Sequence, residues 1–232
     1  MDLTIPEAVL LLAIDDEAGT PLIDDSSLGI AMAAAATAQL LLDGRMRLAG
    51  AGEPGSPEGA LVAATGGTDA RLEPLVAEVA GRTPKAAIER VAGWGGTRTP
   101  GGRLRGRLTD DFAAAGVLAR EQDRFLGMTW RERWERGERR AVEDALQARA
   151  RAVLDGSDEP RVATALAILH GAKALPAVFP DLPKEALERR GEELASASWA
   201  SASVRAAIEA IEAAMVAIMV VTMIVPMTSS GS

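Results

Sequence analysis

Hydrophobic positions in this chain gather in blocks, and residues typical of helix starts and stops bound each block. The first block, Ala8–Ile14, follows Thr4, Pro6 and Glu7, which have the spacing of a capping box with proline in the first helical turn. Acidic residues and Gly19 come after it. Because a helix that is apolar on nearly every side has to be buried on every side, we expect the chain to begin inside its own core.

Similar blocks predict a mostly helical chain. We expect further helices over residues 27–42, 71–80, 84–92, 103–115, 136–154, 160–179, 183–198 and 201–224. Gly116 is placed to end the helix over 103–115. The helix over 136–154 has a repeat of small residues that predicts a seam against a neighbour: Ala141, Ala145, Ala148 and Ala152.

Strands are predicted in two short surface hairpins. The first pairs residues 46–48 with 60–63 across a loop rich in glycine and proline. The second pairs residues 117–119 with 124–128 across a turn at Arg120–Asp123.

The composition agrees with closely packed helices. Of 232 residues 48% are hydrophobic, yet the chain has three phenylalanines and no tyrosine, whereas strands draw on aromatic and β-branched residues. We therefore predict one compact, mostly α domain over residues 1–226, with a hydrophobic helical core, amphipathic helices around it and a flexible tail over 227–232. The absence of cysteine excludes disulfides and thiolate zinc sites.

Charge is distributed unevenly along the chain. The net charge is −8, but residues 82–140 contain 14 Lys and Arg against 8 Asp and Glu, a net +6, which leaves −14 on the rest. A basic middle in an acidic protein favours one surface that faces an anion, such as a phosphate, a lipid headgroup or an acidic partner. The alternative is a solvated charged face with ion pairs between residues four apart.

The strongest apolar tract runs from Ala213 to Pro226. It is shorter than the roughly 20 residues that cross a bilayer, so we expect a buried helix, with a tail anchor as the alternative. Asp2 follows Met1 and no basic segment precedes the first apolar block, so we expect no secretory leader.

Four segments, in order, resemble the Golgi phosphoprotein 3 family, whose bacterial members are GPP34-type proteins. They are the opening stretch Leu3–Gly19, the helix end Ala35–Met46 with its Gly-Arg turn, the stretch Arg103–Leu118 with its Gly-Val-Leu end, and Thr164–His170. The resemblance covers essentially the whole chain. It implies a mostly helical domain with a hydrophobic helical core and surface hairpins.

The resemblance to the eukaryotic members of the family implies a non-enzymatic peripheral membrane protein that binds phosphatidylinositol 4-phosphate. The implied headgroup site combines a Trp and an Arg near the start of the second helix with arginines on the Arg-containing helix. In this chain the first two positions fall near Asp24 and Ala33, and neither side chain suits that role. Arg105 falls on a family arginine, with Arg103 and Arg107 close by.

We therefore expect Arg103, Arg105 and Arg107 to bind the lipid headgroup. Residues two apart do not share a helix face, but side chains and N–H groups at a helix start can converge on one anion. The alternative is a solvated helix start. The glycine-rich residues 93–102 before them have neither phosphate-binding fingerprint and are predicted to form a loop.

The hairpin implied by the resemblance falls on Val117–Trp130. Its apolar residues suit a membrane contact flanked by arginines: Phe125, Leu126, Met128 and Trp130. The alternatives are a contact between copies of the chain and a hairpin that folds back onto the body.

No motif in the sequence favours an enzyme. His170, the only histidine, lies in an apolar helix and is expected to be a core residue, and the acidic clusters lack the pattern of a calcium loop. We expect no catalytic residue, no metal, no cofactor and no nucleic-acid partner.

The expected partners are an anionic phospholipid, with phosphatidylinositol 4-phosphate as a candidate, and a second copy of the chain through the hairpin. The composition, rich in alanine and arginine, is typical of bacteria with GC-rich genomes. We therefore expect a cytoplasmic protein that associates peripherally with the inner face of the cell membrane. The alternative is a soluble protein-interaction module with the same fold that has lost phosphoinositide recognition.

Overall fold

The computed structural model describes residues 2–15, 18–93, 97–125, 128–196 and 215. Residues 122–125, 128–132, 135 and 136 of the longer hairpin are described by their backbone only. The predicted helix over 201–224, apart from the helical and buried Met215, and the predicted tail over 227–232 lie outside the described residues.

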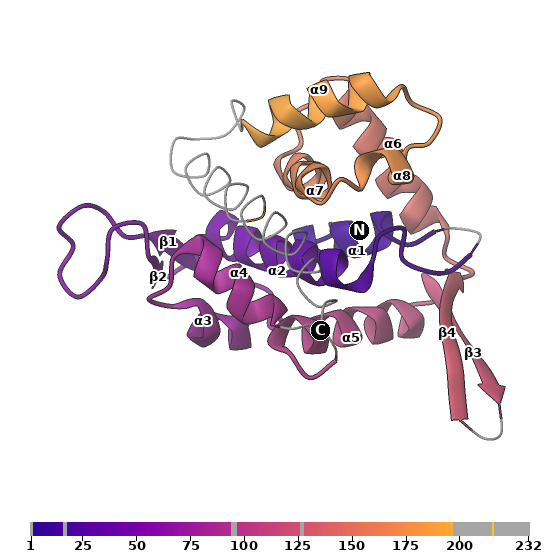
Figure 1. Ribbon diagram of the computed structural model, residues 1–232, viewed down its shortest axis with the longest axis horizontal. Coiled ribbons are helices and arrows are strands. Elements are labelled where there is room, and N and C mark those ends of the chain that lie inside the picture. The colour runs from indigo at the N-terminus through magenta and orange to yellow at the C-terminus, as the bar shows by residue number, and fades with distance from the viewer. Residues whose placement is uncertain (1, 16–17, 94–96, 126–127, 197–214, 216–232) are drawn as a thin grey trace, which may run out of the picture.

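The helices lie in three stacked groups (Figure 1). The middle group is α1 (Ile5–Leu12) and α2 (Asp25–Leu42). On one side of it pack α3 (Glu73–Val79), α4 (Pro84–Ala92) and α5 (Pro100–Ala114). The other side holds α6 (Ala141–Leu154), α7 (Pro160–Gly171), α8 (Leu175–Val178) and α9 (Lys184–Ala195). The prediction of one compact, mostly α domain with a hydrophobic helical core is confirmed.

The first helix forms as its capping residues predict. The Thr4 hydroxyl accepts from the Glu7 N–H at 3.4 Å, and the Glu7 carboxylate accepts from the Thr4 N–H at 2.8 Å. Both halves of the capping box are therefore present, and every residue of α1 is buried. The chain does begin in its own core.

The second helix is the centre of the fold. It packs against α1, α4, α5 and α7, and residues 31–36 are at most 1% exposed. Among the described residues, α2 is the one helix whose length and apolar composition would allow it to cross a membrane. About two thirds of it (67%) is buried inside the protein, as is usual for a core helix.

Two antiparallel hairpins project from opposite ends of the molecule (Figure 1). The first joins β1 (Met46–Leu48) to β2 (Leu61–Ala63), as predicted. The second joins β3 (Leu118–Phe125) to β4 (Met128–Arg136) and is longer than predicted, so residues 120–123 belong to a strand and the predicted turn there is wrong. Its register places residues of unlike charge opposite one another, such as Glu121 and Arg133, which favours the longer pairing.

Two glycines form the base of this hairpin. Gly116 follows the end of α5 with φ +70°, the left-handed conformation expected of a residue that terminates a helix. A Cβ on Gly137 would lie 2.2 Å from the Gly116 carbonyl oxygen. The two strands can therefore meet this closely only with glycine at residue 137.

Three predicted helix boundaries are wrong for local reasons. α5 begins at Pro100 rather than Arg103, because Thr99 caps it. α6 begins at Ala141 rather than Arg136, because β4 extends to Arg136. The predicted helix over 160–179 is two helices, since Lys173 takes a left-handed conformation with φ 56° after α7.

The predicted small-residue seam of α6 is also wrong. Ala141, Ala145 and Ala148 are exposed, and Ala152 is half-buried. The buried face carries bulkier residues instead, among them Leu146 and Val153. Burying these side chains removes more apolar surface from water than burying alanine, and this decides which face of the helix turns inward.

Candidate functional site

A small pocket opens between the first turns of α2 and α5. It is lined by residues of α2, the end of α4 and the start of α5: Asp25, Gly29, Met32, Ala92, Thr97, Thr99, Gly101, Gly102 and Arg105. Its volume is about 60 Å³, which is space for a few water molecules.

The wall from α5 begins with a capped helix start. The Thr99 hydroxyl accepts from the Gly102 N–H at 3.0 Å, and Pro100 occupies the first helical position. A Cβ on Gly101 would lie 2.9 Å from the Val91 carbonyl oxygen, so glycine lets α5 approach α4. The helix dipole favours an anion here. Pro100 has no N–H, and the N–H of Gly102 already donates to the capping hydroxyl of Thr99. Among the first three residues of α5, only the N–H of Gly101 can therefore bind a ligand.

The wall from α2 differs from the site that the resemblance implies. Asp24, near which the family Trp is expected, is the N-cap of α2: it accepts from the Ser27 N–H at 2.9 Å, and hydrogen bonds from Ser27 lower its pKa. Ala33, near which the family Arg is expected, is 0% exposed. The pocket instead meets Asp25, Gly29 and Met32, which have the spacing of one helix face.

Arg105 is the cation of this pocket. Its Nη1 donates to Oδ1 of Asp25 at 2.5 Å, across the gap between α5 and α2. The Arg105 side chain is 33% exposed and that of Asp25 is 61% exposed, so the pair lies at the mouth of the pocket.

The other two predicted headgroup residues point elsewhere. Because α5 begins at Pro100, Arg103 is its fourth residue and Arg107 lies in its third turn, and both are exposed. Arg103 donates to the Arg98 carbonyl at 2.5 Å, and Arg107 donates to the Arg71 carbonyl at 2.8 Å. Arg105 is the one of the three that lines the pocket, and the assignment of all three to headgroup binding stays a prediction.

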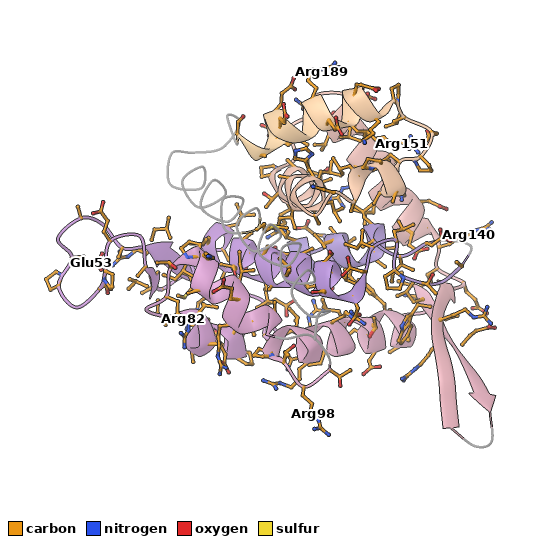
Figure 2. All side chains as sticks on the ribbon, in the orientation of Figure 1. Glu53, Arg82, Arg98, Arg140, Arg151 and Arg189 are labelled. Carbon is orange, nitrogen blue, oxygen red and sulfur yellow. The ribbon has the colours of Figure 1, made fainter. Side chains whose placement is uncertain are left out.

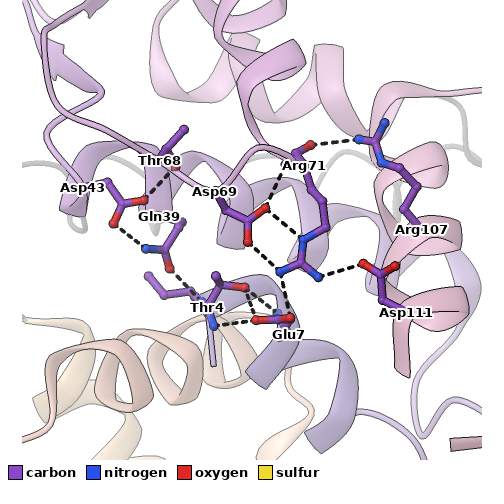
Figure 3. A network of polar contacts seen from close by, with 10 residues as sticks. Thr4, Glu7, Gln39, Asp43, Thr68, Asp69, Arg71, Arg107 and Asp111 are labelled. Atoms are coloured by element: carbon purple, nitrogen blue, oxygen red, sulfur yellow. Dashed lines mark hydrogen bonds and ion pairs between the residues drawn. The ribbon is translucent and has the colours of Figure 1, made fainter. Parts of the chain in front are cut away.

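A polar network holds α5 against α1 (Figure 3). Arg71 pairs with Asp69 at 2.6 Å, with Glu7 at 2.8 Å and with Asp111 of α5 at 3.0 Å. The hydrogen bond from Arg71 is the main cause that lowers the pKa of Asp69. The network therefore fixes the helix that carries Arg105.

Reasoning from the sequence missed this network. Its members come from α1, α2, the segment before α3 and α5, so no local spacing indicates them. The single acidic residue in the apolar first helix, Glu7, was a signal, but its capping role accounts for it equally well. A second branch runs from the Ile5 N–H to Gln39 at 2.8 Å and on to Asp43 at 2.7 Å.

The surface over α4 and α5 is rich in arginine, and part of it is paired. Arg82 and Arg98 are exposed and point outward from this side of the molecule (Figure 2). Arg90 pairs with Glu78 at 2.8 Å, and Lys85 pairs with Glu89, four residues on, at 3.8 Å. The basic middle of the chain thus has outward-pointing arginines as well as ion pairs such as that of Lys85 with Glu89, which a solvated charged face would also have.

The hairpin residues are placed by their backbone. Phe125 ends β3, Met128 begins β4 and Trp130 lies within β4, while Leu126 lies outside the described residues. At the base of the hairpin the Trp134 N–H donates to the Gly19 carbonyl at 2.7 Å. The Arg120 guanidinium lies 5.3 Å from the centre of the Trp134 ring. The hydrogen bond to Gly19 attaches the base to the body, the Arg120–Trp134 contact joins β3 to β4, and the two strands project from the body (Figure 1).

His170 lies at the edge of the core rather than inside it, which corrects the prediction of a core residue. It is half-buried, and burial lowers its pKa. A pocket of about 630 Å³ beside it is also lined by Lys173, Glu188 and Glu192. Within the described ranges, no three His, Cys, Asp or Glu side chains form a group that could hold a metal ion.

Comparison with models of known protein families matches residues 5–211 to Golgi phosphoprotein 3 (GPP34). A search of curated proteins finds no match. The family match spans all the helices and both hairpins described above.

Proposed function

Since the chain belongs to the Golgi phosphoprotein 3 (GPP34) family, we propose that it is a non-enzymatic peripheral membrane protein that recognises anionic lipid headgroups through its basic middle region. The observation that carries the proposal is the position of Arg105. Its side chain lines a small open pocket, within a stretch of the chain whose net charge is +6.

In this proposal the headgroup phosphate enters the pocket and accepts hydrogen bonds from Arg105. A guanidinium can give a phosphate two parallel hydrogen bonds, and the start of α5 adds the positive end of its dipole. Arg103 and Arg107, exposed on the same helix, attract the anionic surface around the bound lipid.

The hairpin supplies a second contact in the same proposal. Phe125, Leu126, Met128 and Trp130 at its tip enter the interfacial region of the bilayer, or contact a second copy of the chain. The lipid is an anionic phospholipid, with phosphatidylinositol 4-phosphate as a candidate, and the protein associates with the inner face of the cell membrane.

A second candidate function is a soluble protein-interaction module with the same fold. Two observations favour it. The carboxylate of Asp25 already pairs with Arg105, and the residues near which the family's Trp and first Arg are expected are a helix cap, Asp24, and a buried alanine, Ala33.

Liposome co-sedimentation distinguishes the two functions. Vesicles of phosphatidylcholine alone are compared with vesicles that also contain phosphatidylglycerol, phosphatidic acid or phosphatidylinositol 4-phosphate. We expect binding to the anionic vesicles only, and we expect it to weaken when the screening length falls from about 10 Å at 0.1 M salt to about 3 Å at 1 M. Absence of binding to every composition would favour the interaction module.

A matched pair of triple variants tests the assigned surface. Arg103→Ala, Arg105→Ala and Arg107→Ala together should abolish sedimentation with anionic vesicles. Lys173→Ala, Lys184→Ala and Arg189→Ala remove three exposed cations from the α7–α9 side and should leave it unchanged. Equal losses in the two variants would show a general charge effect and contradict the assignment.

A further inference from the structure

We propose that the pocket between the end of α7 and α9 binds a small zwitterionic molecule with an apolar body, of the chemistry of a short peptide with apolar side chains. In this site Lys173 binds the carboxylate of the ligand and Glu192 binds its ammonium group. The pocket lies on the other side of α1 and α2 from Arg105, so the site is independent of the function proposed above (Figure 1).

The pocket has the size and the apolar surface of a small-molecule site. Its volume is about 630 Å³, and pockets of roughly 300 to 1,000 Å³ take ligands of drug size. Leu175, Pro176 and Leu187 line it, and the two leucines belong to the hydrophobic core. These side chains can cover the apolar part of a ligand.

Two opposite charges in the lining are available to a ligand. Lys184 and Glu188 pair with each other along α9 at 3.6 Å. Within the described ranges, Lys173 and Glu192 form no ion pair. His170 is neutral near neutral pH, because burial lowers its pKa. A ligand with one charge of each sign therefore complements the lining.

The same balance disfavours ligands with a single sign of charge. An anion bound to Lys173 would share the pocket with the carboxylates of Glu188 and Glu192, and a cation bound to Glu192 would share it with two ammonium groups. Juxtaposed like charges oppose binding. A zwitterion offsets each repulsion with an attraction.

The backbone of Lys173 is strained. Its φ is 56°, and its N–H donates to the His170 carbonyl at 2.8 Å in the turn that ends α7. Glycine is the usual residue in this conformation after a helix, because a Cβ is disfavoured there. A strained residue beside a pocket points to a role for its side chain. The ammonium of Lys173 is that side chain's functional group.

His170 makes the pocket directly observable. It is the only histidine of the chain, and it lines the pocket. Its ring packs against the backbone of α9, since a Cβ on Gly191 would lie 2.3 Å from Nδ1. The Hε1 proton of His170 therefore gives a single imidazole resonance that reports on a ligand in this pocket.

The test is a titration with the dipeptide leucyl-leucine at about pH 7.5, followed through the Hε1 resonance of His170 by nuclear magnetic resonance. A saturable shift is expected. N-acetyl-leucyl-leucine lacks the ammonium and leucyl-leucinamide lacks the carboxylate, so each should bind about two- to fivefold more weakly. Absence of a saturable shift, or equal affinity for the three probes, would overturn the proposal.

Two variants test the assigned charges. Lys173→Gly removes the ammonium and relaxes the backbone, so it should raise the melting temperature and yet weaken leucyl-leucine binding by about two- to fivefold. Lys85→Ala removes a lysine of α4 and is its control. Glu192→Gln should weaken binding by a similar factor, whereas Glu193→Gln, one residue on and outside the lining, should bind as the wild type does. Equal losses in a variant and its control would overturn the site.

A lipid headgroup is another source of a zwitterion. Glycerophosphoethanolamine carries both charges without an apolar side chain, so it should bind more weakly than leucyl-leucine. Tighter binding of glycerophosphoethanolamine would overturn the peptide chemistry of the ligand. Lys173→Gly should leave sedimentation with anionic vesicles unchanged, and a loss there would overturn the independence of this site from the Arg105 pocket.

Discussion

Oε1 of Glu7 accepts a hydrogen bond from Nη2 of Arg71 at 2.8 Å and so joins the first helix to a segment 64 residues later. Glu7 is 6% exposed, and the same guanidinium also pairs with Asp69 and with Asp111 of α5. A buried carboxylate without a partner carries an uncompensated desolvation cost. The contact therefore ties the stability of the core to the position of the helix that carries Arg105.

Arg71→Met should lower the free energy of unfolding by about 2 to 4 kcal/mol, because it leaves the buried Glu7 carboxylate with hydrogen bonds from Thr4 but without a cation. Urea unfolding followed by circular dichroism measures the change. Arg90→Ala removes an exposed arginine paired with Glu78 at 2.8 Å and should cost less than about 1 kcal/mol. Similar losses in the two variants would show that burial of Glu7 does not matter.

Gly191→Ala should destabilise the protein by roughly 1 to 3 kcal/mol, since a Cβ there would lie 2.3 Å from Nδ1 of His170. The melting temperature gives the readout. His170→Ala removes the obstructing ring, so the double variant should lose less than the sum of the two single losses. Additive losses would contradict this packing.

Stability should also depend on pH through His170. Burial lowers its pKa below the ordinary 6.5, although Glu188 and Glu192 act in the opposite direction. Just below pH 6.5 the unfolded chain therefore binds a proton that the folded protein does not. The free energy of unfolding should fall as the pH falls through this window, by at most about 1.4 kcal/mol per pH unit.

Urea unfolding of the wild type and of His170→Gln, at several pH values from about 7.5 to 5, isolates this effect. His170 is the only histidine, so the variant should show a flatter profile in that window. An unchanged slope would assign the pH dependence to other groups.

Gly29→Ala should raise stability by about 0.5 to 1 kcal/mol, because glycine inside a helix costs conformational entropy and no atom lies within 4 Å of the added Cβ. Gly106→Ala on α5 is a matched control with equally open surroundings. Both should raise the melting temperature, but Gly29 lines the pocket, so only Gly29→Ala should weaken binding to anionic vesicles. Equal binding by the two variants would place the ligand elsewhere.

The triple variant Phe125→Ser, Met128→Ser and Trp130→Ser should weaken vesicle binding most at high salt, where apolar contacts remain and electrostatic attraction is screened. Its melting temperature should stay close to that of the wild type, because the hydrogen bond that attaches the hairpin to Gly19 lies at its base, at Trp134. A lower melting temperature with unchanged vesicle binding would indicate that the tip packs on the body or on a second copy.

Local signals predicted the helices whose ends carry capping residues. Thr4 and Glu7 indicated α1 correctly, and the loop rich in glycine and proline indicated the β1–β2 hairpin. Thr99 lies in a glycine-rich stretch whose composition predicts a loop. The predicted start of α5 is therefore three residues too late, although Thr99 caps the helix. The alanine repeat of α6 wrongly predicted the buried face. Spacing alone does not show whether the face with the alanines or the face with Leu146 and Val153 packs inward.

The candidate site was harder to predict because it depends on contacts between distant segments. Arg105 was named from the sequence, but its partner Asp25 lies 80 residues away on another helix. The network around Arg71 likewise joins residues from four segments. Such pairs follow from how helices pack, and no spacing along the chain encodes them.

The enclosure of α2 has a consequence for how relatives of this protein can diverge. Residues 31–36 are at most 1% exposed, so a larger side chain there would require adjustment in the helices that pack against α2. The first turn of the same helix faces the pocket mouth, where Asp25 is 61% exposed and can be exchanged without repacking. Substitutions in the first turn of α2 can therefore change the mouth of the pocket in evolution while the scaffold stays constant.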